Sequence, residues 1–153
     1  MNTEEVATKL VELCRKGEWR KALEELYAKE IVSVEAHEME NMPAEMRGID
    51  QVRGKTDWWE KNMEVHSAKV GGPFVARDKF VVQFDIDVTE KGSNKRMQMS
   101  EVGIYTVKDG KISREEISAF GGSVIERSGA AISKETASMS LYPIKVVCGR
   151  NKS

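Results

Sequence analysis

The chain has 153 residues, 40% apolar and 32% charged, with a net charge of −1. This composition is typical of one soluble globular domain whose core needs neither disulfides nor metal ions, and it excludes a disordered chain. The balanced charge argues against binding to a phosphate backbone, so no nucleic-acid partner is expected.

The N-terminal part of the chain predicts a helical hairpin. Asn2 and Thr3 are good helix caps, and apolar residues then recur at helical spacing up to Gly17, which ends the helix. A second apolar stripe begins at Trp19 and ends at Tyr27. The stripes of two such short helices must be covered by another element.

Residues 31–37 predict the first strand, because apolar and polar residues alternate there. The polar residues are Ser33, Glu35 and His37. Residues 38–48 predict a loop, and a third helix begins near Asp50, with Trp58 and Trp59 on different sides.

The rest of the core predicts strands over residues 65–70, 79–89, 96–107 and 111–120, with a tight turn at Asp109-Gly110. The strand 79–89 alternates most clearly, and its apolar face holds Phe80, Val82, Phe84, Ile86 and Val88. Helices followed by an antiparallel meander indicate the α+β class, with a curled sheet packed on three N-terminal helices.

Residues 121–153 have weak periodicity and many small residues. We expect a C-terminal extension beyond a domain of residues 1–120, partly mobile or adding one strand at residues 144–148. The core should not depend on it.

Several strings in this order resemble the SnoaL-like, or polyketide cyclase-like, proteins of the nuclear transport factor 2-like superfamily. They are Tyr27-Ala28, residues 31–35, Gly48-Ile49-Asp50, Trp58-Trp59, His66 ahead of Gly72-Pro73, residues 80–89, residues 99–102 and residues 105–112. The resemblance implies a cone-shaped, cystatin-like fold with a small apolar ligand in its pocket, and frequent dimerisation. Since the superfamily includes cyclases, isomerases, hydrolases, dehydratases and non-catalytic modules, it implies no single reaction.

Matching by position narrows the chemistry that the resemblance implies. Glu35 falls where isomerases of this fold carry a general-base aspartate, but Leu10 and Val102 fall where they carry a tyrosine and an acid. Ketosteroid isomerisation is therefore not expected. Phe84, Ile86 and Ile117 fall where epoxide hydrolases need an Asp-Arg-Asp network, so that chemistry is not expected either.

The candidate catalytic residues are Glu35, His66 and Glu115. Glu35 alternates with His37, so the pair offers a base with an orienting partner, or else the solvent-exposed face of an edge strand. His66 is a catalytic or a structural histidine, and Glu115 is the inward one of two neighbouring glutamates. Glu101 interrupts an apolar face, which requires a raised pKa or a nearby cation.

The expected pocket lining is aromatic and apolar, although any one of these residues can equally belong to the core. The lining residues are Trp19, Tyr27, His37, Trp58, Trp59, Phe84, Ile86, Val102 and Ile117. No phosphate-binding or dinucleotide-binding glycine loop is present, and the two histidines lack ligand spacing, so no cofactor and no metal are expected.

Cys14 and Cys148 stand far apart, as in proteins of a reducing compartment. Residues 1–9 are polar rather than signal-like, and no apolar run is long enough to span a membrane. These features predict a cytoplasmic protein without a membrane partner.

Two functions stay open at this point. One is acid–base chemistry on an apolar carbonyl compound, using Glu35 or His66. The other is a non-catalytic ligand-binding or dimeric interaction module. In either case we expect a homodimer through the sheet face that carries Val81, with Met97, Met99 and Tyr105 assigned to that same face.

Overall fold

The computed structural model describes residues 1–38 and 41–125. Over these residues the chain forms three helices and six strands. The helices are α1 (Thr3–Arg15), α2 (Trp19–Leu26) and α3 (Ile49–Asn62). The strands are β1 (Tyr27–Val34), β2 (Glu45–Arg47), β3 (Met63–Ala76), β4 (Lys79–Glu90), β5 (Lys95–Lys108) and β6 (Lys111–Ile125).

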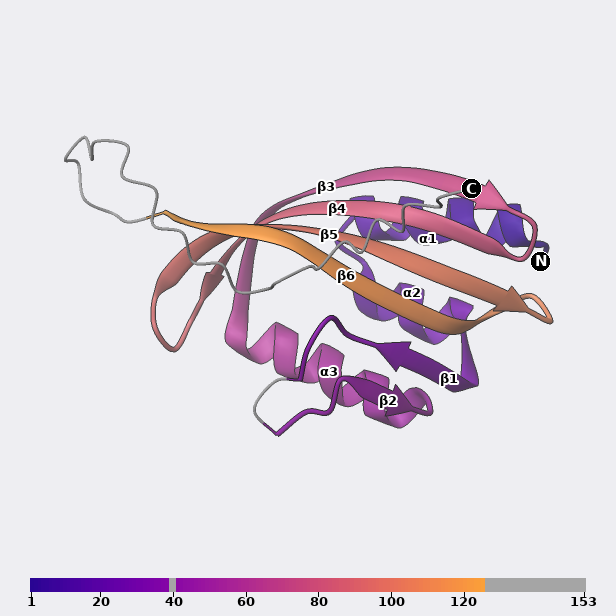
Figure 1. Ribbon diagram of the computed structural model, residues 1–153, viewed down its shortest axis with the longest axis horizontal. Helices are drawn as coiled ribbons and strands as arrows, with labels where there is room; N and C mark the ends of the chain where they lie inside the picture. The colour runs from indigo at the N-terminus through magenta and orange to yellow at the C-terminus, as the bar shows by residue number, and fades with distance from the viewer. Residues whose placement is uncertain (39–40, 126–153) are drawn as a thin grey trace, which may run out of the picture.

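The strands form one sheet in the order β2-β1-β6-β5-β4-β3 (Figure 1). The predicted meander is confirmed, because β3, β4, β5 and β6 pair antiparallel in succession. In addition, β1 pairs parallel with β6, and Ser33 lies directly opposite Glu115. This pairing joins the two ends of the domain and completes the expected α+β cone.

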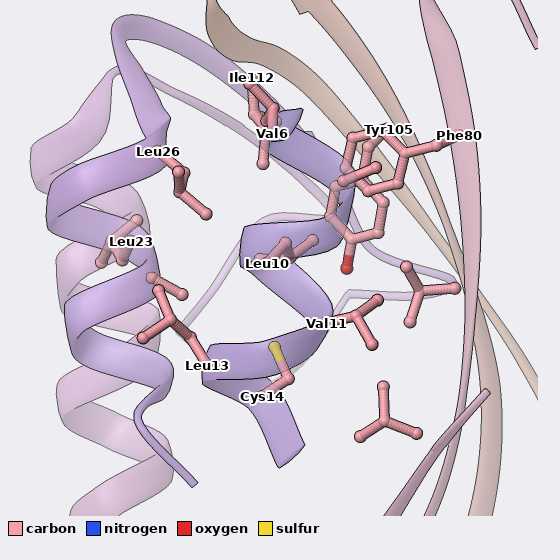
Figure 2. Packing of buried hydrophobic residues seen from close by; sticks show 14 of the residues in the cluster. Val6, Leu10, Val11, Leu13, Cys14, Leu23, Leu26, Phe80, Tyr105 and Ile112 are labelled. Carbon is pink, nitrogen blue, oxygen red and sulfur yellow. The ribbon is translucent and has the colours of Figure 1, made fainter. Parts of the chain in front are cut away.

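The inner face of the sheet forms the core with the helices. The predicted apolar face of β4 is confirmed, because all five of its residues are buried. From α1, Val6, Leu10, Val11 and Cys14 are buried in the same cluster. Figure 2 shows the side chains of this helix between α2 and the strands, where the rings of Phe80 and Tyr105 stack with centroids 4.9 Å apart.

The ends of α1 follow the sequence closely. Asn2 caps the helix, and its side chain and that of Glu5 bond reciprocally to each other's backbone N–H groups. Gly17, with φ at +72°, follows its C-terminus. Arg15 then ties α1 to the sheet by donating to the carbonyl oxygens of Val70 and Gly72 on β3.

Several predicted boundaries are wrong. β1 begins at Tyr27 and ends at Val34, so Glu35 and His37 follow the strand. The alternative of a solvent-exposed edge strand fails, because β1 lies between β2 and β6 and Ser33 is fully buried. The predicted loop 38–48 contains β2, whose pairing with β1 its sequence does not signal. α3 begins at Ile49, next to the predicted start near Asp50, and Gly48 is its N-cap.

The C-terminal strands are longer than predicted. β3 continues past Gly71 through a register shift, across the cis Gly72-Pro73 bond, and pairs with β4 as far as Ala76. β6 continues to Ile125, so the predicted extension begins inside a strand. The candidate strand 144–148 lies outside the described residues.

The two faces of β5 are also assigned differently. Met97, Met99 and Tyr105 pair with Val88, Ile86 and Phe80, so they share the inner face. Their assignment to the outer face is wrong, because residues directly opposite each other in a sheet point to the same side.

Of the described helices, none is long and apolar enough to cross a membrane.

Candidate functional site

A cavity of about 290 Å³ lies between the helices and the inner face of the sheet. Its walls are largely apolar and contain six aromatic side chains. They include all three tryptophans of the chain together with Tyr27, Phe84 and Tyr105. Trp19 from α2 and Phe84 from β4 contact each other with ring centroids 5.9 Å apart.

Most residues expected at a pocket do line this cavity. Besides Glu35 and Glu115, they are Trp19, Tyr27, His37, Trp58, Trp59, Phe84, Ile86 and Ile117. Leu10, matched by position to a catalytic tyrosine of isomerases, lines it too.

Two expected residues lie elsewhere. Val102 is on the outer face, because it alternates with the cavity-lining Glu101 and pairs with Gln83 and Ser118. His66 is exposed on β3 and does not line the cavity. Its Nε2 lies 2.7 Å from Thr89 Oγ1 on the neighbouring strand.

A lysine organises the polar end of the cavity. Lys55 Nζ, from α3, donates to Glu35 Oε1 at 2.6 Å, to Glu115 Oε1 at 2.7 Å and to Ser33 Oγ at 3.0 Å. An ammonium group has three donors, so each N–H of Lys55 has one protein partner. The lysine therefore joins α3, the end of β1 and β6 through one charged group.

Glu115 is the most enclosed charged member of this cluster, with 3% of its surface exposed. Its carboxylate accepts hydrogen bonds from Tyr27 Oη at 2.7 Å and from Ser33 Oγ at 2.6 Å, besides the bond from Lys55. The inward orientation expected for Glu115 is confirmed. The parallel pairing of β1 with β6 explains it, because that register places Ser33 opposite this residue.

The two partners of the buried ion pair stabilise each other's charge. Burial by itself raises the pKa of Glu115, but the Lys55 cation and the three hydrogen bonds outweigh burial and lower it. Burial likewise lowers the pKa of Lys55, and the carboxylates of Glu115 and Glu35 outweigh it and raise that pKa. Lys55 is therefore fixed as a cation and is not a nucleophilic amine.

Glu101 lines the same cavity, but its carboxyl group is unpaired among the described residues and its pKa is raised instead of lowered. No described side chain forms a hydrogen bond or an ion pair with its carboxyl group: Arg96 pairs with Asp87, and Arg114 pairs with Glu116. Burial raises the pKa of Glu101 to about 7, the charge of Glu35 adds to the effect, and Lys55 opposes it. Of the two alternatives for this position, a raised pKa or a pairing cation, the structure favours the raised pKa.

Lys55 is the functional candidate that the sequence analysis did not identify. The signal for it was present: it stands three residues after the buried Val52 and four before Trp59, on the apolar stripe of α3. A cation on such a stripe requires an anionic partner inside the fold. The partner could not be named, because Glu115 is 60 residues away in sequence.

The described residues of the cavity do not supply a thiolate nucleophile or a metal site. Cys14 lines it, but burial raises the pKa of its thiol to about 12, so it is not a thiolate at neutral pH. Within residues 1–38 and 41–125, no group of three or more His, Cys, Asp or Glu side chains could hold a metal ion.

Known proteins match this chain in fold, and the matches cover most of its residues. A SnoaL-like polyketide cyclase candidate from Mesorhizobium loti is 41% identical, covers 77% of this chain and 99% of its own, and superposes with a TM-score of 0.73. A candidate isomerase from Bacillus subtilis shares the fold at 17% identity, with 78% of this chain and 90% of that chain covered and a TM-score of 0.63. So does a SnoaL-like polyketide cyclase candidate from Jannaschia sp. CCS1, at 17% identity, with 75% of this chain and 85% of that chain covered and a TM-score of 0.60. Among curated proteins, none matches. The SnoaL-like domain family matches residues 1–118, and the chain belongs to this family.

Proposed function

We propose that this protein carries out acid–base chemistry on an apolar carbonyl compound held in the cavity, of the isomerase, cyclase or dehydratase type. The observation that carries the proposal is the contrast between two carboxyl groups at the cavity wall. Glu35 is ion-paired with Lys55, whereas Glu101 is unpaired and has a pKa of about 7. Two carboxyl groups held in different states can serve as base and acid on one substrate.

The step follows from these two states. The carboxylate of Glu35 takes a proton from the carbon next to the carbonyl group, and protonated Glu101 gives its proton to the carbonyl oxygen. The substrate becomes the enol, and the proton taken at carbon balances the one given to oxygen. Lys55 keeps Glu35 in position, and Glu115 holds Lys55.

The size of the cavity limits the substrate. Its volume of about 290 Å³ is at the small end of the range of roughly 300–1,000 Å³ for ligand pockets. A compound of one or two rings fits this space better than a larger polycyclic one.

Deuterium exchange tests the proposal without the natural substrate. The α-protons of 1-tetralone, a two-ring ketone, are followed by NMR in D₂O with and without protein. We expect exchange above the buffer rate, and a loss of about 100-fold or more in Glu35→Gln, as for removal of a general base. Glu116→Gln, on the outer face, is the matched control and should keep the wild-type rate.

The pH dependence assigns the role of Glu101. If protonated Glu101 is the acid, exchange per bound ketone falls as the pH rises through about 7. Glu101→Gln keeps a hydrogen-bond donor that does not titrate, so the fall of the exchange rate with rising pH should disappear. A rate that instead rises through this pH would make Glu101 the base and contradict the assignment.

The alternative is a non-catalytic ligand-binding module. It is favoured by the complete set of partners of Lys55, which leaves no vacant donor on this cation for a substrate. A ketone that quenches the tryptophan fluorescence, and so binds, but exchanges no faster in wild type than in Glu35→Gln would support this alternative.

A further inference from the structure

The charges around the cavity do not balance. Three carboxyl groups line it, those of Glu35, Glu101 and Glu115, and they face one ammonium group, that of Lys55. With Glu101 protonated, two carboxylates remain against one cation. With Glu101 ionised, there are three carboxylates against one cation.

The other walls supply no compensating positive charge. Among the described residues, α1, α2, β3 and β4 contribute uncharged side chains to the lining. The titratable groups that line the cavity together with Glu101 are Glu35 and His37 after β1, Lys55 on α3, Glu115 on β6, Cys14 on α1, and the phenols of Tyr27 and Tyr105. The thiol and both phenols have raised pKa values, so they stay uncharged near neutral pH.

The aromatic side chains of the cavity also favour a positively charged ligand. Trp19, Trp58 and Trp59 line the cavity, and the faces of indole rings attract cations. A carboxylate in this space would meet two or three like charges at low dielectric. Lys55, the one cation among the described lining residues, already has a protein partner for each of its N–H groups.

We propose that the cavity selects its ligand by charge: it favours an apolar ring compound that carries a protonated amine, accepts an uncharged one, and rejects one that carries a carboxylate or a phosphate. This inference rests on the proposed function, because it takes the cavity as the ligand site. It adds that the carbonyl substrate bears no anionic group.

Three probes that share one skeleton test the inference. They are 1-aminoadamantane, 1-acetyladamantane and adamantane-1-carboxylate, which are cationic, neutral and anionic between about pH 6 and pH 8. All three tryptophans line the cavity, so quenching of their fluorescence measures the dissociation constants on the full chain. At pH 8 we expect the amine to bind at least about tenfold more tightly than the carboxylate, with the ketone between them.

The contribution of Glu101 is isolated by its pH dependence. The ratio of the two charged probes should widen from pH 6 to pH 8 in the wild type, because Glu101 ionises over this range. Glu101→Gln should show a smaller ratio at pH 8 and less widening, whereas the outer-face variant Glu116→Gln should behave as wild type.

The outcomes are decisive for this inference. A carboxylate that binds as tightly as the amine overturns it, and so does a failure of all three probes to bind. If the charge ranking holds but 1-tetralone exchanges no protons, the proposed reaction fails while the selectivity stands. If 1-tetralone exchanges protons but the ranking is absent, the selectivity fails alone.

Discussion

At the scale of single residues, Glu101 and Glu115 show how position sets the state of one side-chain type. Both belong to the inner face of neighbouring strands, and both line one cavity. Glu115 has Lys55, Ser33 and Tyr27 around its carboxylate, so its pKa is lowered. Glu101 is buried near the like charges of Glu35 and Glu115, so its pKa is raised to about 7. The difference comes from the partners and not from the amount of burial alone.

This contrast predicts how stability depends on pH. The pKa of Glu101 is above its ordinary value of 4.5, so its contribution to stability is fully present below about pH 4.5 and is lost as the pH rises through about 7. Glu101→Gln removes the ionisation. We therefore expect this variant to exceed the wild type in free energy of unfolding by about 3 kcal/mol at pH 8, because the pKa rises from 4.5 to about 7 and each pKa unit is worth about 1.4 kcal/mol, and by little at pH 4.5.

Urea unfolding at a series of pH values measures this difference. Glu115 has the opposite sign, because its lowered pKa gives stability that is present above pH 4.5 and lost below it. The range between pH 4.5 and 8 therefore isolates Glu101. Stability curves of variant and wild type that stay parallel across this range would show that Glu101 is not shifted.

At the scale of elements, β5 carries a close contact that only glycine permits. A Cβ atom on Gly103 would lie 2.6 Å from the Cε2 and Oη atoms of Tyr105. The Tyr105 ring cannot easily move, because it stacks on Phe80 at an interplanar angle of 14° (Figure 2). Gly103 therefore allows the tyrosine to lie along its own strand and line the cavity.

We expect Gly103→Ala to displace Tyr105 and to lower the free energy of unfolding by about 1–3 kcal/mol, as for other overpacked cores. Gly54→Ala is the matched control. That glycine is exposed on α3, and an added Cβ has no neighbour within 4 Å. It should stabilise the protein by about 0.5–1 kcal/mol through helix propensity. A Gly103→Ala protein as stable as wild type in urea would contradict the close contact.

At the scale of the whole molecule, the outer face of the sheet carries an apolar row. Phe74 on β3 pairs with Val81 on β4, which pairs with Ile104 on β5. Phe74 is 67% exposed and Ile104 is 37% exposed. Exposed apolar side chains that form one row are typical of a contact surface. The row lies on the sheet face first expected for dimer formation, the one that carries Val81, but Met97, Met99 and Tyr105 do not belong to that face.

We expect this row to join two copies in a symmetric homodimer, and Phe74→Asp to produce a monomer. Sedimentation velocity at micromolar concentration distinguishes the two states. Val75→Asp serves as the control, because Val75 is 42% exposed but pairs with Phe80 and so points to the other face. A wild-type protein that sediments as a monomer would refute the dimer.

The sequence by itself determined most of the elements and the buried face of β4. Residues 79–89 alternate so regularly that the buried face of β4 could be identified directly, and Asp109-Gly110 predicted the β5–β6 hairpin. These signals are local, because helix and strand periods are set by neighbours along the chain. Glu101 was recognised as unusual for the same reason, since it interrupts an apolar face.

Only the tertiary structure decided which groups meet at the polar end of the cavity. The parallel pairing of β1 with β6 brings Ser33 to Glu115, and α3 then adds Lys55 to both. No local pattern records a contact across 60 or 82 residues. Strand pairing and helix packing set burial, and burial with its partners sets the charge of each carboxyl group.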